Sequence, residues 1–298
     1  MHLPPDFTRN IVGAFGEAGR HWQEKLPGLI TQATIRWGLS NLQPVPNLSY
    51  NYVAFAQRGD EEVVLKVGVP DRELSSEMAA LECFDGIGAC RLLEKDEKNF
   101  CFLLERLKPG ELLSSLADDD KATRIAVQVM QTLWKPAPTS DKLIQLSDWL
   151  DGLKRIRAHD EGGMGPIPDK LLRHVESLLL QLFMEPNRVL IHGDLHHDNI
   201  LLSERGWLAI DPKGVIGPAG YEIGPFMLNP LSEIPDEGRF RKRSERRIEI
   251  LTEMLGFERE QIIQWSTVHA VLSAWWNVED GLGWDYSMRC AEILSKIT

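Results

Sequence analysis

The sequence contains little cysteine, and no two of its four cysteines (Cys83, Cys90, Cys101 and Cys290) have the Cys-x-x-Cys spacing. That spacing is typical of zinc sites and of redox-active pairs. A chain of 298 residues can also bury an adequate core without disulfides. We therefore expect reduced thiols and a cytoplasmic protein.

Long apolar runs are absent too. The densest one, "SLLLQLF" at 177–183, is far shorter than the roughly 20 residues that a membrane-spanning helix needs. The first residues, "MHLPPDFTRNIVG", lack the basic segment and apolar stretch of a secretory signal. The sequence thus predicts no membrane association.

Basic residues are outnumbered, with 33 Lys and Arg against 44 Asp and Glu and a net charge of −11. An acidic chain is a poor binder of nucleic acid, because binding depends on neutralising phosphates. It can instead attract a small cation. One stretch, "FRKRSERRIEIL" at 240–251, is basic but interleaved with glutamate, and we expect an exposed helix face there.

Hydrophobic periodicity divides the chain into two parts. Residues 1–39 have helical spacing broken at Pro27-Gly28, and "YNYVAFAQ" and "EEVVLKVG" form a predicted β-hairpin. A helix beginning at Asp71 and two more strands, in "ACRLLEKD" and "NFCFLLERL", follow before Pro109-Gly110 marks a hinge.

Helices dominate after the hinge. We expect them at 118–134, 141–158, 169–184, 235–255 and 258–279, with a β-hairpin embedded between 188 and 211. The prediction is an α+β fold in two lobes: a small β-rich N-lobe over 1–107 and a larger helical C-lobe over 108–298.

The segment "IHGDLHHDNILL" at 191–202 concentrates polar side chains between two apolar runs. His192 and His196 have the spacing of a helical zinc pair, but Gly193 and the flanking strands argue against a helix, and the catalytic Glu of zinc proteases is missing. "GDLH" also resembles a metallophosphoesterase block, yet that family's Gly-Asn-His block is absent.

Phosphoryl transfer explains the segment better. Asp194 and Asn199 are five residues apart, as are the catalytic Asp and metal-binding Asn of kinases. Asp211 ends the next predicted strand, where kinases place a second metal-binding Asp. A lysine on a strand is also needed, and Lys66 is the lone basic residue in an apolar strand. Because burying an unpaired ammonium is costly, Lys66 requires an acidic partner.

The combination of "HGDLHHDNILL" with "IDPKGVIGPAGYEIG" resembles the aminoglycoside phosphotransferase family, in particular its streptomycin 6-phosphotransferase and hydroxyurea-resistance kinase group, from about residue 45 onward. The resemblance implies a protein-kinase-like fold and ATP-dependent phosphorylation of a hydroxyl on an aminoglycoside such as streptomycin. It implies Asp194 as catalytic base, and Asn199 and Asp211 as Mg²⁺ ligands. Glu77 is then the partner of Lys66, with Glu73 as the alternative.

The resemblance also implies a nucleotide site. Backbone groups of Glu105 and Leu107 would contact adenine between Val64 and Leu202, and Ser49 would help to cover the phosphates. No Gly-x-Gly-x-x-Gly motif precedes Lys66, so GTP stays possible beside ATP. His192 is expected to brace the loop and Glu222 to anchor it.

A cationic acceptor requires carboxylates and aromatic rings. Candidate substrate-binding residues are His197, Lys213, Trp276, Glu279 and Asp280, with Trp275 and Asp285 nearby in the sequence. Two alternatives remain open: a kinase for another small acceptor (hydroxyurea or a metabolite alcohol), and a catalytically silent nucleotide-binding protein. We expect a monomer or a homodimer.

Overall fold

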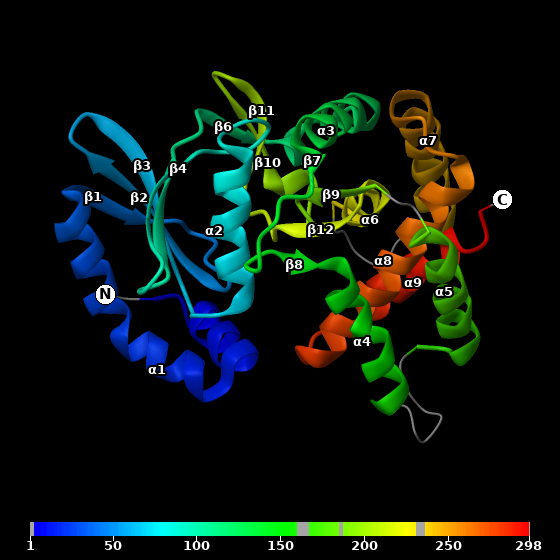
Figure 1. Cartoon of the computed structure of the whole chain (residues 1–298), viewed down its shortest axis with the longest axis horizontal. Coiled ribbons are helices and arrows are strands. Elements are labelled where there is room, and N and C mark those ends of the chain that lie inside the picture. The colour runs from blue at the N-terminus through cyan, green and yellow to red at the C-terminus, as the bar shows by residue number, and fades with distance from the viewer. Residues whose placement is uncertain (1–2, 160–166, 185–186, 231–235, 298) are drawn as a thin grey trace.

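The computed structural model describes residues 3–159, 167–184, 187–230 and 236–297. A sheet-rich N-terminal part lies beside a mostly helical C-terminal part (Figure 1), so the α+β prediction is confirmed. The proposed border at 107/108 stays a prediction. The helices are α1 (Pro5–Trp37), α2 (Arg72–Phe84), α3 (Asp119–Leu133), α4 (Leu146–His159), α5 (Asp169–Leu182), α6 (Ile223–Leu228), α7 (Glu237–Leu255), α8 (Arg259–Glu279) and α9 (Asp285–Leu294), with 3₁₀ turns η1 (Leu113–Ser115), η2 (His197–Asn199) and η3 (Ala219–Glu222).

Within the described residues the strands form three sheets. The strands are β1 (Leu39–Pro44), β2 (Asn51–Arg58), β3 (Glu61–Gly68), β4 (Leu92–Asp96), β5 (Cys101–Glu105), β6 (Pro109–Leu112), β7 (Lys135–Pro136), β8 (Ile144–Gln145), β9 (Arg188–Ile191), β10 (Ile200–Ser203), β11 (Gly206–Ala209) and β12 (Val215–Pro218). Their orders are β1-β2-β3-β5-β4, β11-β10-β6 and β7-β9-β12-β8. The sequence did not predict β1, the short strands β6, β7, β8 and β12, or helix α9.

The five-stranded antiparallel sheet separates α1 from α2. Because side chains alternate along a strand, Val63, Leu65 and Val67 of β3 pack in the cluster that includes α1. Val64, on the opposite face, packs with residues of α2. This alternation also turns Lys66 toward α2, so the strand delivers one polar group to the side that faces the C-terminal part.

Helix α1 is bent at Gly16 and not at Pro27, where we expected the break. Gly16 has a φ of +54°, a conformation that glycine adopts without steric cost. The two halves fold against each other, with the rings of Phe7 and Trp22 6.2 Å apart. The helix continues through Pro27 because the second half keeps its buried face, including Leu26, against the sheet.

The largest core cluster belongs to the C-terminal part, where α8 supplies buried residues along most of its length. Among the described helices, none is both long and apolar enough to cross a bilayer. Helix α2 is fixed to this part through Ser76, whose hydroxyl donates to Gly214 O at 2.7 Å and accepts from Ile144 N at 3.2 Å. A Cβ on Gly214 would lie 2.6 Å from Ser76 O, so only glycine permits this close approach. The contact places α2 beside the 211–214 turn.

Candidate active site

Lys66 lies at the point where the two parts of the molecule meet. Its Nζ contacts Glu77 Oε1 and Oε2 at 2.7 and 2.8 Å and Asp211 Oδ1 at 2.9 Å. Burial acts to lower the pKa of Lys66, but the two carboxylates outweigh it and raise the pKa. Burial, opposed by Lys66 and assisted by Asp211, raises the pKa of Glu77 to about 7. The sheet lysine, the helix acid and the hairpin acid therefore form one buried cluster with excess negative charge.

The alternative acid, Glu73, lies one turn earlier on α2 and has a different partner. Its Oε2 accepts from Lys213 Nζ at 2.7 Å. Burial acts to lower the pKa of Lys213, but Glu73 and Asp194 outweigh it and raise the pKa. Helix α2 therefore holds two lysines with two acids, Lys66 inside and Lys213 closer to solvent.

The catalytic-loop candidate begins at a buried anchor. Glu222 accepts from the backbone N–H groups of His192 (2.6 Å) and Gly193 (2.9 Å). His192 Nε2 contacts Ile210 O at 2.7 Å, and its Nδ1 accepts from Asp194 N at 3.2 Å. Both ring nitrogens of His192 are thus engaged in hydrogen bonds, so neither offers a free lone pair to a zinc ion. Burial lowers the pKa of His192 to about 3, so the ring is a neutral brace.

Asp194 and Asn199 are joined by a hydrogen bond across the loop. Asn199 Nδ2 donates to Asp194 O at 3.0 Å, and Ile210 N donates to Asn199 O at 2.9 Å. The Asp194 side chain is 40% exposed, so a substrate hydroxyl can reach it. Burial raises its pKa against the opposing effect of His196 and Lys213, and Asp211 adds to the rise. A carboxylate with a raised pKa is a better proton acceptor.

Asn199 and Asp211 fit a magnesium ion. Asn199 Oδ1 and Asp211 Oδ2 accept no hydrogen bond from any residue in the described ranges, whereas Asn199 Nδ2 and Asp211 Oδ1 are already used. Mg²⁺ typically takes one or two protein oxygens together with water and substrate phosphates. Asp211 has a φ of +58°, an uncommon backbone conformation that clusters at functional sites.

The expected nucleotide residues are only partly arranged as predicted. Ser49 is exposed in the connection from β1 to β2. The N–H of Glu105 donates to Arg91 O at 3.0 Å, so of its two backbone groups only the carbonyl could pair with a base, and the expected contact stays a prediction. Leu107 packs in the same cluster as Val64. Leu201, and not Leu202, is the β10 leucine of that cluster.

The acceptor candidates are distributed unevenly around Asp194. Asp280 is exposed at the end of α8, and its pKa is raised by burial first and then by Glu279 and Glu73. Trp276 packs edge-on against Trp149, with ring centroids 5.4 Å apart. Glu279 is paired with Arg155 at 2.7 Å in a partly exposed ion pair, and its contact with an acceptor stays a prediction.

Two other residues of this predicted set, Trp275 and His197, are buried. Trp275 is 4% exposed and belongs to the helical cluster. His197 is 2% exposed and stacks on Phe226 at 4.4 Å, so it cannot contact an acceptor, and our expectation for it is wrong. Asp285 is exposed in the first turn of α9.

Sequence reasoning missed Trp149 of α4. A Cβ built on Gly193 would lie 3.1 Å from Trp149 Cη2, so the indole lies against the loop that carries Asp194. In the sequence Trp149 belongs to an ordinary amphipathic helix, and no local pattern separates it from a core residue. Tyr50 was missed as well: burial and then Asp280 raise its pKa, which places the β1–β2 connection near the acceptor side.

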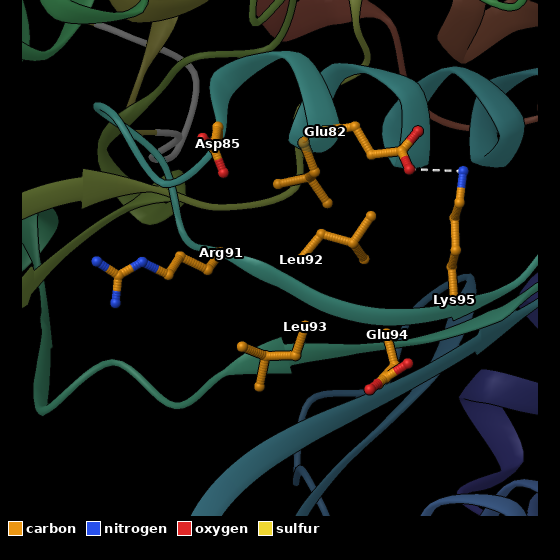
Figure 2. Close-up of a pocket in the computed structure, with 8 residues that line it drawn as sticks. Glu82, Asp85, Arg91, Leu92, Leu93, Glu94 and Lys95 are labelled. Atoms are coloured by element: carbon orange, nitrogen blue, oxygen red, sulfur yellow. Dashed lines mark ion pairs between the residues drawn. The ribbon is translucent and has the colours of Figure 1, made fainter.

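A separate groove of about 360 Å³ lies between the C-terminal half of α2 and β4 (Figure 2). Glu82 and Lys95 form an ion pair of 2.6 Å across it. None of the candidate site residues lines this groove. The candidate active site is therefore identified by its converging side chains, and this groove is not part of it.

The fold places the protein in the protein-kinase-like class. A choline kinase from Streptococcus pneumoniae superposes with a TM-score of 0.66 over 92% of this chain and 99% of its own, at 13% identity. An aminoglycoside phosphotransferase, solved with ADP and hygromycin B, superposes with a TM-score of 0.61 over 89% and 97%, also at 13% identity. At such low identity these structures establish the protein-kinase-like fold alone.

Sequence comparison gives the family. Residues 37–281 match the model of the aminoglycoside/hydroxyurea antibiotic resistance kinases, and the chain belongs to this family. Streptomycin 6-kinase of Streptomyces griseus is 30% identical over 95% of this chain and 92% of its own. Hydroxyurea phosphotransferase of Kitasatospora aureofaciens is 35% identical over 94% and 82%. Streptomycin 3''-kinase of Klebsiella pneumoniae is 32% identical over 83% and 91%. The expected family and the phosphotransferase activity are thereby confirmed.

Proposed function

We propose that this protein transfers the γ-phosphoryl group of ATP to a hydroxyl group of a streptomycin-type aminoglycoside in the cytoplasm. The observation that carries the proposal is the 2.9 Å contact of Lys66 Nζ with Asp211 Oδ1. It brings the lysine of the sheet to the acid of the hairpin, beside the loop that carries Asp194 and Asn199.

In this proposal Asp194 accepts the proton of the acceptor hydroxyl. The oxygen of that hydroxyl attacks the γ-phosphorus at the same time. The new O–P bond forms as the bond to the β,γ-bridging oxygen breaks, and ADP leaves. Lys66, oriented by Glu77, binds phosphate oxygens of the nucleotide. Asn199 and Asp211 would hold Mg²⁺, which neutralises charge that develops on the phosphates. Asp194 is near enough to Lys213 to raise the pKa of this lysine, so Lys213 can also approach the transferred phosphoryl group.

The acceptor side favours a cation. Asp280 is exposed one helical turn after Trp276, whose ring packs against Trp149, and Glu73 acts on the pKa of Asp280 from α2. Guanidinium groups stack on aromatic rings and pair with carboxylates, and such groups distinguish streptomycin from neutral hydroxyurea. Hydroxyurea is the second candidate because the hydroxyurea phosphotransferase is 35% identical to this chain.

A coupled ADP-release assay tests the proposal with streptomycin, other aminoglycosides and hydroxyurea, each with Mg-ATP and Mg-GTP. We expect turnover with streptomycin and a kcat lower by about 10²–10⁴-fold in Asp194→Asn. Nucleotide affinity should stay close to that of the wild type, because Asp194 faces the acceptor. Retained turnover in Asp194→Asn would overturn the assignment of the base. ADP binding without turnover on any acceptor would favour the silent nucleotide-binding protein.

A further inference from the structure

A fully buried arginine lies beneath the loop that carries Asp194, outside the groups used above. Arg247 of α7 is 0% exposed, although its sequence context predicted an exposed helix face. Its guanidinium donates to Asp119 Oδ2 (2.9 Å) and Oδ1 (2.5 Å), to Phe226 O (3.0 Å) and to Asn229 O (2.6 Å). Four of its five N–H groups therefore tie together α3, α6 and α7.

The fifth N–H reaches the loop. Arg247 Nη2 lies 3.2 Å from His197 Nε2. Because arginine has no acceptor, His197 Nε2 must accept, and the proton of the ring must be on Nδ1. A ring that accepts at Nε2 and carries its proton on Nδ1 is neutral, which suits a side chain that is 2% exposed. Phe226 completes the arrangement: His197 stacks on it at 4.4 Å, and Arg247 lies over it at 4.7 Å.

His197 and Asn199 belong to the same 3₁₀ turn, η2. Asn199 N donates to His196 O at 3.0 Å, and its side chain reaches back to Asp194 O. Fixing the ring of His197 therefore fixes the turn that aims Asn199 Oδ1. Glu222 anchors the first half of the loop through backbone N–H groups of residues 192–195, and no hydrogen bond joins it to η2 among the described residues. The turn η2 is held instead by Arg247 through His197 and by Ser114 Oγ, which donates to Asp198 Oδ1 at 2.5 Å.

We propose that Arg247 is a positioning residue that acts through His197 to aim the oxygen of Asn199 at the metal-nucleotide complex. The inference rests on the proposed function, since it requires a metal ion at Asn199. It assigns a role to a residue that contacts neither nucleotide nor acceptor. It also explains why a histidine occupies a loop position where its side chain cannot meet substrate.

The test measures ADP affinity by calorimetry with and without Mg²⁺. In His197→Leu, Arg247 loses its loop acceptor, and we expect the Mg²⁺-dependent gain in ADP affinity to fall about 10-fold, as for residues that orient metal ligands. ADP affinity without Mg²⁺ should not change. His197→Gln restores an acceptor at the position of Nε2 and should recover most of the gain. Arg247→Lys keeps the charge but loses two donors, and it should resemble His197→Leu.

Val175→Ala, at a buried core position in α5, is the matched control for destabilisation alone. It should lower the thermal midpoint without changing the Mg²⁺ dependence. An unchanged Mg²⁺ dependence in a folded His197→Leu protein would overturn the inference and leave the proposed function intact. Absence of any Mg²⁺ dependence in the wild-type protein would overturn the metal role of Asn199 and this inference with it. Asn199→Ala gives the reference for complete loss.

Discussion

Lys66 and Arg247 are both buried cations, but their surroundings differ. Lys66 contacts two carboxylates, Glu77 and Asp211, so the group of three carries a net negative charge. Arg247 contacts one carboxylate, Asp119, and otherwise neutral acceptors, so its cluster is balanced. The side chain of Asp211 is 48% exposed, whereas the whole Arg247 residue is 0% exposed.

Because of this difference, we expect the Lys66 cluster to exchange hydrogen-bond partners and the Arg247 cluster to keep them. A cluster with excess negative charge next to solvent can accept another cation, and under the proposed function Mg²⁺ with its nucleotide would supply one. Lys66 would then release Asp211 and bind phosphate oxygens while it keeps Glu77. Arg247 has used every donor, so any rearrangement would leave buried groups without partners, which is costly. Lys66 should therefore affect catalysis, and Arg247 should affect folding and loop geometry.

Among variants that compare the two buried cations, the largest effect should come from Lys66→Met. Loss of a charged donor to the phosphates should lower kcat/KM by about 10²–10³-fold, comparable to removal of one transition-state donor. The measurement is the coupled ADP assay, with circular dichroism as a check on folding. Activity within a few-fold of the wild type would show that the two cations are equivalent structural ions.

Arg247→Met should act mainly on stability, whereas Lys66→Met acts mainly on catalysis. It leaves Asp119 and two backbone carbonyls without their donor, and we expect a loss of about 3 kcal/mol in the free energy of unfolding, at the low end for a broken buried pair. The discount reflects Asp119, whose side chain is 37% exposed. Urea unfolding measures the loss. A stability like that of the wild type would mean that the cluster relaxes without cost.

The two cations also show what the sequence could predict. Lys66 was found because a single lysine in an apolar strand is a local anomaly, and Asp194, Asn199 and Asp211 have a recognisable spacing. Arg247 stands among four other basic residues in "FRKRSERR". Its burial depends on Asp119 and Phe226, which are distant in the sequence, so no local pattern could separate it from its exposed neighbours. Trp149 and His197 were misjudged for the same reason: tertiary contacts decide which face of a short segment is covered.

A third prediction concerns pH and the neutral state of His197. Its pKa is about 2 in the folded protein, against about 6.5 when unfolded. Below pH 6.5 the unfolded chain therefore binds a proton that the folded chain does not, and stability falls by about 1.4 kcal/mol per pH unit. In His197→Gln, the loss of unfolding free energy between pH 7.5 and pH 5.0 should be smaller by about 2 kcal/mol. Equal losses in both proteins would show that His197 can charge beside Arg247.

The smallest effect distinguishes two acids on one helix. Glu77 and Glu73 are one turn apart on α2, and each holds a lysine at 2.7 Å. Glu77 is buried with Lys66, whereas the side chains of Glu73 and Lys213 are 50% and 38% exposed. An exposed pair contributes at most about 1 kcal/mol, which corresponds to about 5-fold, so Glu73→Gln should change kcat/KM by less than about 5-fold. Glu77→Gln should lower it by about 10-fold or more, because Lys66 then lacks the carboxylate that orients it once Asp211 turns to the metal. The matched pair is measured in one ADP-release assay at saturating Mg²⁺. A larger effect from Glu73→Gln than from Glu77→Gln would make Lys213, and not Lys66, the cation on which transfer depends.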